Sequence, residues 1–77
     1  MEKSLLRQFG ANLRAERERL HLSQEELADL SDSHRNYVGG VERGERNPTL
    51  TKIIALARGL GVSPFTLLKG LDEGKGR

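Results

Sequence analysis

Residues 22–48 have the sequence LSQEELADLSDSHRNYVGGVERGERNP, and this stretch decides the fold. Ser23 and, three positions later, Glu26 match a capping box, in which each side chain bonds a free backbone N–H of the other residue. Leu22 before the cap and Leu27 after it are placed to form the hydrophobic staple that fixes how the chain enters a helix. The pattern therefore predicts a helix that begins directly after Ser23.

This helix is predicted to end near Leu30, because residues 31–33 (SDS) prefer turns and caps. A second helix is predicted over residues 34–43, with Ser33 as its N-cap and Gly44 as its C-terminal stop. Two short helices joined by a tight polar turn are typical of a helix-turn-helix, whose second helix enters the major groove of DNA.

Three further helices and no strands are predicted around this pair, because each apolar segment repeats at intervals of three and four residues. One extends from about Ser4 to Leu20, one follows the cap Thr49 and stops at Gly61, and a short one opens at Ser63-Pro64. The expected inward-facing residues are Leu6, Phe9, Leu13, Leu20, Val38, Val41, Ile53, Ala57 and Leu60. We therefore expect an all-α, compact five-helix domain over residues 1–70 and a flexible tail over residues 71–77.

Composition limits the class of protein. Seventy-seven residues make one small domain with a thin core, so we expect a second copy of the chain to supply further buried area. The chain has no cysteine, and His21 and His34 lie too far apart for a zinc-binding pair, so we expect no metal and no cofactor. No apolar run approaches the roughly 20 residues of a membrane span, and the N-terminal residues do not form a signal-peptide core, so we expect a cytoplasmic protein.

The net charge of +2 is too small to predict nucleic-acid binding by itself, but residues 31–58 hold more cations than acids. At the start of the second helix of the pair, Arg35 is able to grip guanine with two hydrogen bonds, and Asn36 is able to do the same for adenine. The alternative is an ordinary solvated first turn. Because the two residues follow a capped helix and a tight turn, DNA contact is favoured.

The segments 22–28 (LSQEELA) and 37–48 (YVGGVERGERNP) resemble the Cro/repressor (XRE-like) helix-turn-helix family, and the resemblance covers about residues 5–70. It implies a lambda-repressor-like domain that binds DNA as a transcriptional regulator. The size and the run over 35–47 are most similar to the controller proteins of restriction-modification systems, which bind palindromic operators as homodimers. The chain departs from the family's pattern at Asp32-Ser33, where many members have glycine followed by an apolar residue.

The resemblance implies two sets of DNA contacts and one structural ion pair. The base-contacting positions are Arg35, Asn36, Tyr37 and Arg46, and the backbone-contacting positions are Ser23, Gln24, Gly39, Arg43 and Asn47. Arg17 on the first helix is expected to pair with Glu42 and hold the second helix of the pair in place. For Arg43 and Arg46, the alternative is ordinary surface solubility. Gly39 and Gly40 either let the DNA backbone approach or mark a weakly folded helix, and both interpretations stay open.

The apolar residues of the last two helices exceed what one face needs. Those left over for a twofold interface are Leu50, Ile54, Phe65 and Leu68. The alternative is that all four complete a small core. Dimerisation itself is better supported, since one recognition helix contacts only a few base pairs and specific affinity generally needs two half-sites.

We therefore expect a regulator of bacterial or phage origin that binds double-stranded DNA as a homodimer. We expect it to bind no membrane, and no small-molecule effector is evident. An enzyme is not expected, because the chain lacks a nucleophile–base pair, a metal set and room for a pocket. Three alternatives remain: a phage-type repressor, the antitoxin of a toxin-antitoxin pair, and a protein-interaction module that keeps this fold without binding DNA. Arg35, Arg43 and Arg46, on and beside the second helix of the pair, argue against the protein-interaction module.

Overall fold

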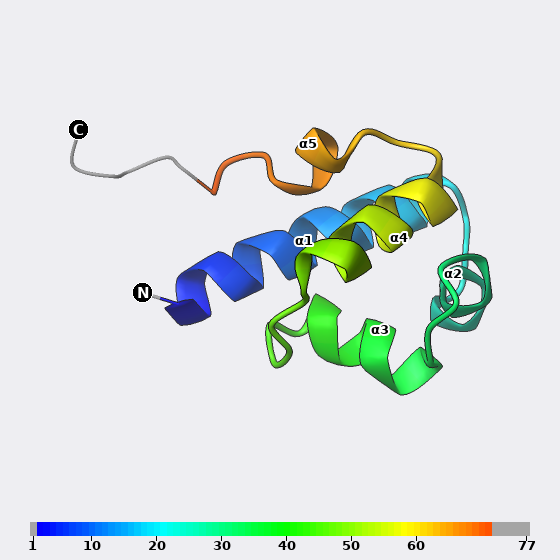
Figure 1. Ribbon diagram of the computed structural model, residues 1–77, viewed down its shortest axis with the longest axis horizontal. Coiled ribbons are helices and arrows are strands. Elements are labelled where there is room, and N and C mark those ends of the chain that lie inside the picture. Colours follow the sequence, from blue (N-terminus) through cyan, green and yellow to red (C-terminus); the bar gives the residue numbers. More distant parts are fainter. Residues whose placement is uncertain (1, 72–77) are drawn as a thin grey trace.

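The computed structural model describes residues 2–71, and within this range the chain forms five α-helices and no β-strand. The helices are α1 (Glu2–Arg19), α2 (Gln24–Leu30), α3 (Arg35–Glu42), α4 (Leu50–Leu60) and α5 (Pro64–Leu67) (Figure 1). The predicted all-α class and five-helix order are confirmed. None of the helices in this range is long and apolar enough to cross a membrane. Residues 72–77 of the predicted tail lie outside the described range, whereas Leu71, also assigned to that tail, packs against the core.

Every helix contributes to one hydrophobic core. Its buried residues are Phe9, Leu13, Leu27, Ala28, Val38, Val41, Leu56, Ala57, Leu60 and Leu67. Fully burying a leucine or valine contributes about 1.5–3 kcal/mol relative to leaving it exposed. The long helix α1 spans the molecule, with α2 and α3 together at one side and α5 at the opposite side (Figure 1). Of the two helices predicted to contact a second copy, α5 therefore lies apart from the helix predicted to contact DNA, whereas α4 packs against α2.

A close approach between α1 and the end of α3 fixes the position of α3. A Cβ atom at Gly10 would lie only 2.4 Å from the carbonyl oxygen of Val41, so α1 meets α3 where it has no side chain. Gly44, directly after α3, has a left-handed φ of +78°, and a Cβ atom there would lie 2.8 Å from Cγ of Arg7. Both positions need glycine, because a side chain at either would force the two helices apart.

Three helix starts follow the predicted caps. The Ser23 hydroxyl accepts the backbone N–H of Glu26 at 3.0 Å, and the Ser23 backbone N–H donates to Oε1 of Glu26 at 2.7 Å. This completes the capping box of α2. Thr49 and Ser63 cap α4 and α5 with their side chains, and Gly61 ends α4 in the left-handed conformation. These starts and stops are specified locally, by the residues next to them.

The prediction that Ser33 caps α3 is wrong. The N-cap residue is His34, whose side chain makes no capping hydrogen bond to any described residue, and α3 is one residue shorter than predicted at each end. Ser33 lies one position too early, and its hydroxyl donates instead to the carbonyl oxygen of Ser31 at 3.2 Å. Asp32 has a left-handed φ of 55°, which aspartate tolerates better than most residues. The turn is thus built from polar side chains rather than from glycine.

The first helix also differs from its prediction. It begins at Glu2 instead of Ser4 and ends at Arg19. Leu20, predicted to face inward, is 36% exposed. The chain leaves the helix there and turns through His21, which has a left-handed φ of 59°. The apolar stripe of α1 therefore ends earlier than the three-and-four spacing predicts.

Candidate nucleic-acid interface

Helix α3, called the recognition helix, buries one side and exposes the other. Val38 and Val41 are fully buried in the core. Arg35 and Asn36, in the first turn, are exposed. Two side chains that are able to form paired hydrogen bonds with base edges thus belong to the solvent side of a firmly packed helix.

Tyr37, also in the first turn of the recognition helix, is half-buried and has two cations near its ring. The guanidinium carbon of Arg46 lies 6.0 Å from the ring centroid, and Nζ of Lys52 lies 5.5 Å from it. Both distances are in the range of cation–π attraction. Burial raises the pKa of Tyr37 above its ordinary value, and the positive charge of Arg46 acts against this rise. The phenol is therefore neutral near pH 7, and its ring contacts two other segments of the chain.

The two adjacent glycines of the recognition helix let long side chains lie close to it. A Cβ atom at Gly40 would lie 2.8 Å from Cγ of Arg46. A Cβ atom at Gly39 would lie 3.1 Å from Nη1 of Arg43 and 3.4 Å from Oε1 of Gln24. Both glycines are buried. They make room for three side chains that were predicted to contact DNA, while contact between DNA and Gly39 itself stays a prediction.

The beginning of α2 carries the two remaining residues predicted to bind phosphate. Ser23 is exposed, and its oxygen already accepts the capping hydrogen bond. Gln24 is half-buried, and its Nε2 donates to Oε1 of Glu42 at 3.0 Å. This bond holds the Gln24 amide beside the recognition helix, next to Gly39. Gln24 is thus close to the helix that it is predicted to assist, whereas the contacts of Ser23 are within α2.

Glu42, in the last turn of the recognition helix, forms an ion pair with Arg17 of α1. Nε of Arg17 donates to Oε2 at 2.6 Å, and Nη2 donates to Oε1 at 3.1 Å. The two side chains are only 11% and 3% exposed. Hydrogen bonding to Glu42 raises the pKa of Arg17 above its ordinary value. The acidic charge of Glu42 is therefore neutralised inside the fold and does not oppose an approaching phosphate.

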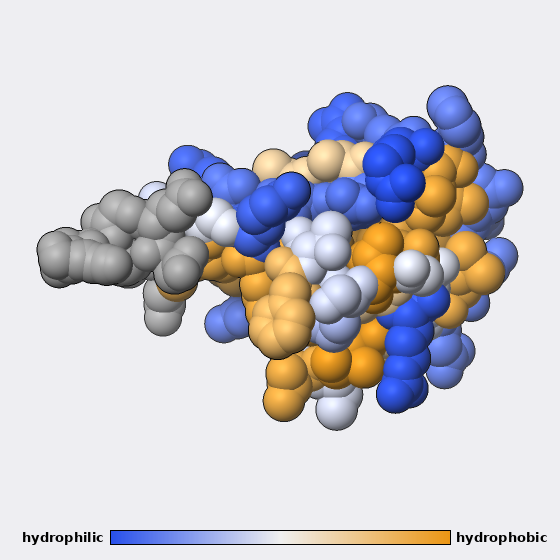
Figure 2. Space-filling view, turned by 90° about the horizontal axis from the view of Figure 1, so that it is seen from above, coloured by the Kyte–Doolittle hydropathy of each residue, from blue (hydrophilic) through white to orange (hydrophobic). Residues whose placement is uncertain are grey.

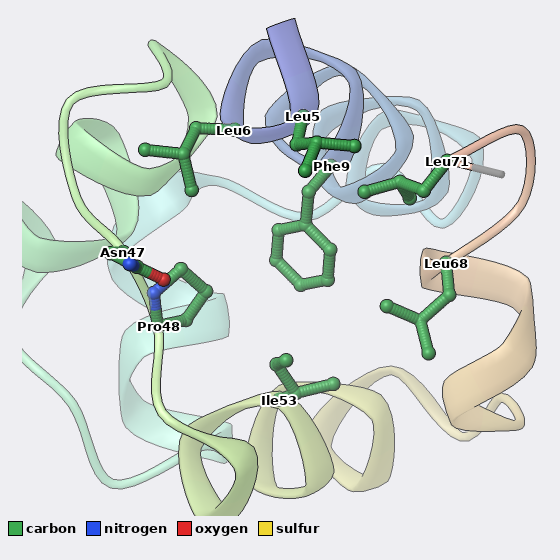
Figure 3. Close-up of a pocket in the computed structure, with 8 residues that line it drawn as sticks. All are labelled: Leu5, Leu6, Phe9, Asn47, Pro48, Ile53, Leu68 and Leu71. Carbon is green, nitrogen blue, oxygen red and sulfur yellow. The ribbon is translucent and has the colours of Figure 1, made fainter. Parts of the chain in front are cut away.

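The loop after the recognition helix supplies three exposed polar residues, Arg43, Arg46 and Asn47. Nε of Arg43 lies 3.1 Å from Oε1 of Glu45, and both side chains are 60% exposed. A surface pair of this kind contributes at most about 1 kcal/mol, so Arg43 is able to exchange it for a phosphate contact. We call the surface formed by Arg35, Asn36, Arg43 and Arg46 the basic face, whereas Asn47 lies beside Pro48 at the rim of an apolar hollow (Figure 3).

The sequence prediction missed Lys52, which the fold brings to the edge of the basic face. Its Nζ donates to Oγ of Ser33 at 2.8 Å and to the carbonyl oxygen of Asp32 at 3.1 Å. A local signal was present, since Lys52 occupies the third helical position after the cap Thr49, where a capping box has Glu or Gln. A cation there also opposes the helix dipole. A residue that breaks such local rules often serves a tertiary role.

A second set of residues, predicted to form a twofold interface, belongs to α4, to α5 and to the residue after α5. Leu50 is 73%, Phe65 80% and Leu68 38% exposed, and Ile54 is half-buried. Figure 2 shows hydrophobic groups open to solvent on the side of α5. A neighbouring hollow of about 290 Å³ is lined mainly by apolar side chains from α1, α4 and the segment after α5 (Figure 3). Leu50 and Phe65 therefore do not complete the core, which was the alternative role for all four residues.

The fold and the basic face define a class of protein, the helix-turn-helix DNA-binding regulators, in which one exposed side of the recognition helix enters a groove. The chain belongs to the helix-turn-helix family HTH_3, whose family model matches residues 13–67. The predicted membership of the XRE-like helix-turn-helix family is thereby confirmed.

Relatives of known type cover most of the chain. It is 48% identical over 70 residues to "Control protein C.SmaI" of Serratia marcescens, which spans 88% of this chain and 83% of that protein. It is 43% identical over 61 residues to "Control protein C.BamHI" of Bacillus amyloliquefaciens, and this match covers 78% of this chain and 75% of that protein. The crystal structure of the restriction-modification controller protein C.AhdI from Aeromonas hydrophila matches with a TM-score of 0.80 at 52% identity, covering 80% of this chain and 94% of that one. The predicted similarity to controller proteins is confirmed.

Proposed function

We propose that the chain is a restriction-modification controller protein, a homodimer that binds a palindromic operator and regulates transcription. The observation that carries the proposal is the exposed Arg35 and Asn36 pair on a recognition helix whose other side is buried. The names of the relatives support the same role. The chain acts by binding and carries out no reaction, in the cytoplasm of a bacterial host, where its DNA lies.

On this proposal the predicted DNA-contacting residues form two sets, one that contacts bases and one that contacts phosphates. Arg35 grips guanine O6 and N7, and Asn36 pairs with adenine, each contributing about 1–3 kcal/mol of base discrimination. Tyr37 and Arg46 complete the base-contacting set, with Tyr37 placed to contact a deformable step. The residues that position the protein on the DNA backbone are Ser23, Gln24, Gly39, Arg43 and Asn47.

The proposed dimer supplies the second half-site. In a helix-turn-helix dimer the two recognition helices contact half-sites about 10–10.5 bp apart. The side chains of Leu50, Phe65 and Leu68 are exposed and Ile54 is half-buried, so these apolar residues are available for a twofold interface. Because occupancy then depends on dimer concentration, the operator responds to protein level with a threshold, which suits timed expression of a neighbouring gene.

The competing functions differ in what they require. A phage-type repressor shares the same basic face and differs only in the gene that it controls. An antitoxin needs a toxin gene beside its own. A protein-interaction module requires no base-contacting side chains, whereas Arg35, Arg43 and Arg46 are exposed on or directly after the recognition helix.

The proposal is tested by an anisotropy titration against the DNA directly upstream of the gene, with competitor DNA and a salt series. A scrambled duplex of the same length is the control. We expect binding roughly a thousandfold or more tighter than to the scrambled duplex, with a steep salt dependence and a footprint of two half-sites. Binding no tighter than to the scrambled duplex, followed by failure to select a preferred site from random DNA, would refute the proposal.

A further inference from the structure

The turn of the helix-turn-helix is held from outside the motif. Lys52 belongs to the first turn of α4, yet its Nζ donates to Oγ of Ser33 at 2.8 Å and to the carbonyl oxygen of Asp32 at 3.1 Å. The same Nζ lies 5.5 Å from the centroid of the Tyr37 ring. One half-buried ammonium group thus contacts both the turn and the first turn of the recognition helix.

The turn has hydrogen-bonding groups that match this ammonium. The Ser33 hydroxyl donates its proton to the carbonyl oxygen of Ser31 at 3.2 Å, which leaves its lone pairs free to accept from Lys52. The Ser31 hydroxyl in turn donates to the carbonyl oxygen of Leu27 at 2.8 Å, inside α2. A chain of hydrogen bonds therefore runs from α4 through the turn to α2.

The start of the recognition helix has little other support from side chains. Its N-cap, His34, makes no capping hydrogen bond within the described residues. Asp32, two residues earlier, has the left-handed φ of 55°, which costs aspartate more than glycine although less than most other residues. Donation by a charged group to the carbonyl oxygen of Asp32 favours this conformation, because charge-assisted hydrogen bonds are stronger than neutral ones.

We propose that Lys52 is a positioning residue for DNA recognition, which fixes the turn and the Tyr37 ring so that Arg35 and Asn36 meet the base edges in the correct orientation. The inference rests on the proposed function of these two residues. Paired hydrogen bonds to a base depend strongly on angle, so a loosened helix start lowers discrimination between bases more than it lowers general affinity for DNA.

The test is Lys52→Met, with Arg58→Met as the matched control. Arg58 is an exposed cation near the other end of α4, so its replacement removes the same charge from the same helix. Affinity is measured on the operator and on an operator with one substituted half-site, each over a salt series. The near-ultraviolet circular dichroism of Tyr37 is recorded without DNA, since Tyr37 is the only tyrosine and the chain has no tryptophan.

For Lys52→Met we expect the ratio of the two affinities to fall roughly tenfold, the effect of losing a hydrogen bond from a charged group. The salt slope stays unchanged, and the Tyr37 band weakens. Arg58→Met leaves the ratio and the band as they are. An unchanged ratio or an unchanged band for Lys52→Met would overturn the proposal, as would a uniform loss on all sequences with the salt slope reduced by about one, which marks a phosphate contact.

A second variant covers the case in which Lys52→Met does not fold. Ser33→Ala removes one acceptor of the ammonium and keeps Lys52, so we expect a smaller fall of the same ratio. An unaltered ratio would contradict the proposed role of Lys52. If the wild-type protein itself shows no operator preference, the proposed function fails, and the Tyr37 band of Lys52→Met still decides separately whether Lys52 holds the ring.

Discussion

Arg17 and Glu42 join α1 to the last turn of the recognition helix through two parallel hydrogen bonds, at 2.6 Å and 3.1 Å. Arg17 also donates through Nη1 to the carbonyl oxygen of Leu22 at 2.6 Å, and Glu42 also accepts from Gln24 at 3.0 Å. The pair therefore links α1, the segment before α2, α2 itself and the recognition helix. It places an acid next to the basic face without leaving its charge exposed.

Removing one partner of this pair is expected to be strongly destabilising. Arg17→Met leaves the carboxylate of Glu42 buried without its main counter-charge, so the free energy of unfolding should fall by about 3–5 kcal/mol. Urea unfolding measures the change. The control is Arg14→Met, which breaks the exposed Arg14–Glu18 pair and should change stability by no more than about 0.5 kcal/mol. Equal effects of the two variants would show that the Arg17–Glu42 pair behaves as a surface pair.

Gly10→Ala should destabilise the protein because the added Cβ would lie 2.4 Å from the carbonyl oxygen of Val41, a backbone atom that is unable to move without α3. We expect a loss of at least about 1–3 kcal/mol, as for overpacked cores. Gly39→Ala is the contrast, since its Cβ meets only the ends of side chains, Nη1 of Arg43 at 3.1 Å and the amide of Gln24 at 3.4 Å. The better helix propensity of alanine should then raise stability by up to about 1 kcal/mol. Thermal melts that show the same sign for both variants would contradict this difference in packing.

Arg35→Ala should weaken discrimination at one position of each half-site by about 1–3 kcal/mol while the fold is retained. Arg43→Ala is the companion variant, because Arg43 is predicted to bind phosphate. It should weaken binding uniformly across sequences and reduce the salt slope by about one. Both are measured by titrating single-substitution variants of the operator. Uniform loss for Arg35→Ala would move that residue to the phosphate-binding set.

The predictable part of this structure is the part specified by neighbouring residues. Ser23, Thr49 and Ser63 cap their helices as expected, because an N-cap bonds backbone groups only two or three positions away. The cap of the recognition helix was mispredicted because Ser33 bonds to Ser31 and to Lys52, which is 19 positions away. The basic face was predictable from the helix-turn-helix pattern, whereas the residue that supports it from α4 became visible only when the helices were packed together.

Phe65→Asp should convert the proposed dimer into monomers and weaken operator binding. Phe65 is 80% exposed, so the substitution removes little from the core, and two carboxylates near a twofold axis repel each other. Sedimentation velocity measures the oligomeric state. Leu30→Asp is the control, because Leu30 is also a large apolar residue with an exposed side chain (56%). It lies on α2 and is not one of the residues predicted to form the interface. An unchanged dimer for Phe65→Asp would remove that residue from the interface.

Tyr37 should make the protein sensitive to alkali. Its pKa in the folded state is raised by burial, so the folded protein holds the phenol proton at pH values where the unfolded chain, with a tyrosine pKa of about 10, has lost it. The stability contribution is complete below the unfolded pKa and is lost as the pH rises through the folded one. Tyr37→Phe should remove this pH dependence, measured by urea unfolding at several alkaline pH values.

The cause of the shift is testable in the same pH range. Phenolate absorbance reports Tyr37 alone, because the chain has no other tyrosine. Since the charge of Arg46 lowers the pKa of Tyr37 against the effect of burial, Arg46→Met should raise that pKa further. Arg43→Met, which removes a cation that does not contribute to the shift, should leave the titration in place. A folded-state titration at or below that of the urea-unfolded chain would show that the attraction of the nearby cations outweighs the effect of burial, and an unchanged titration for Arg46→Met would contradict the role of Arg46 in the shift.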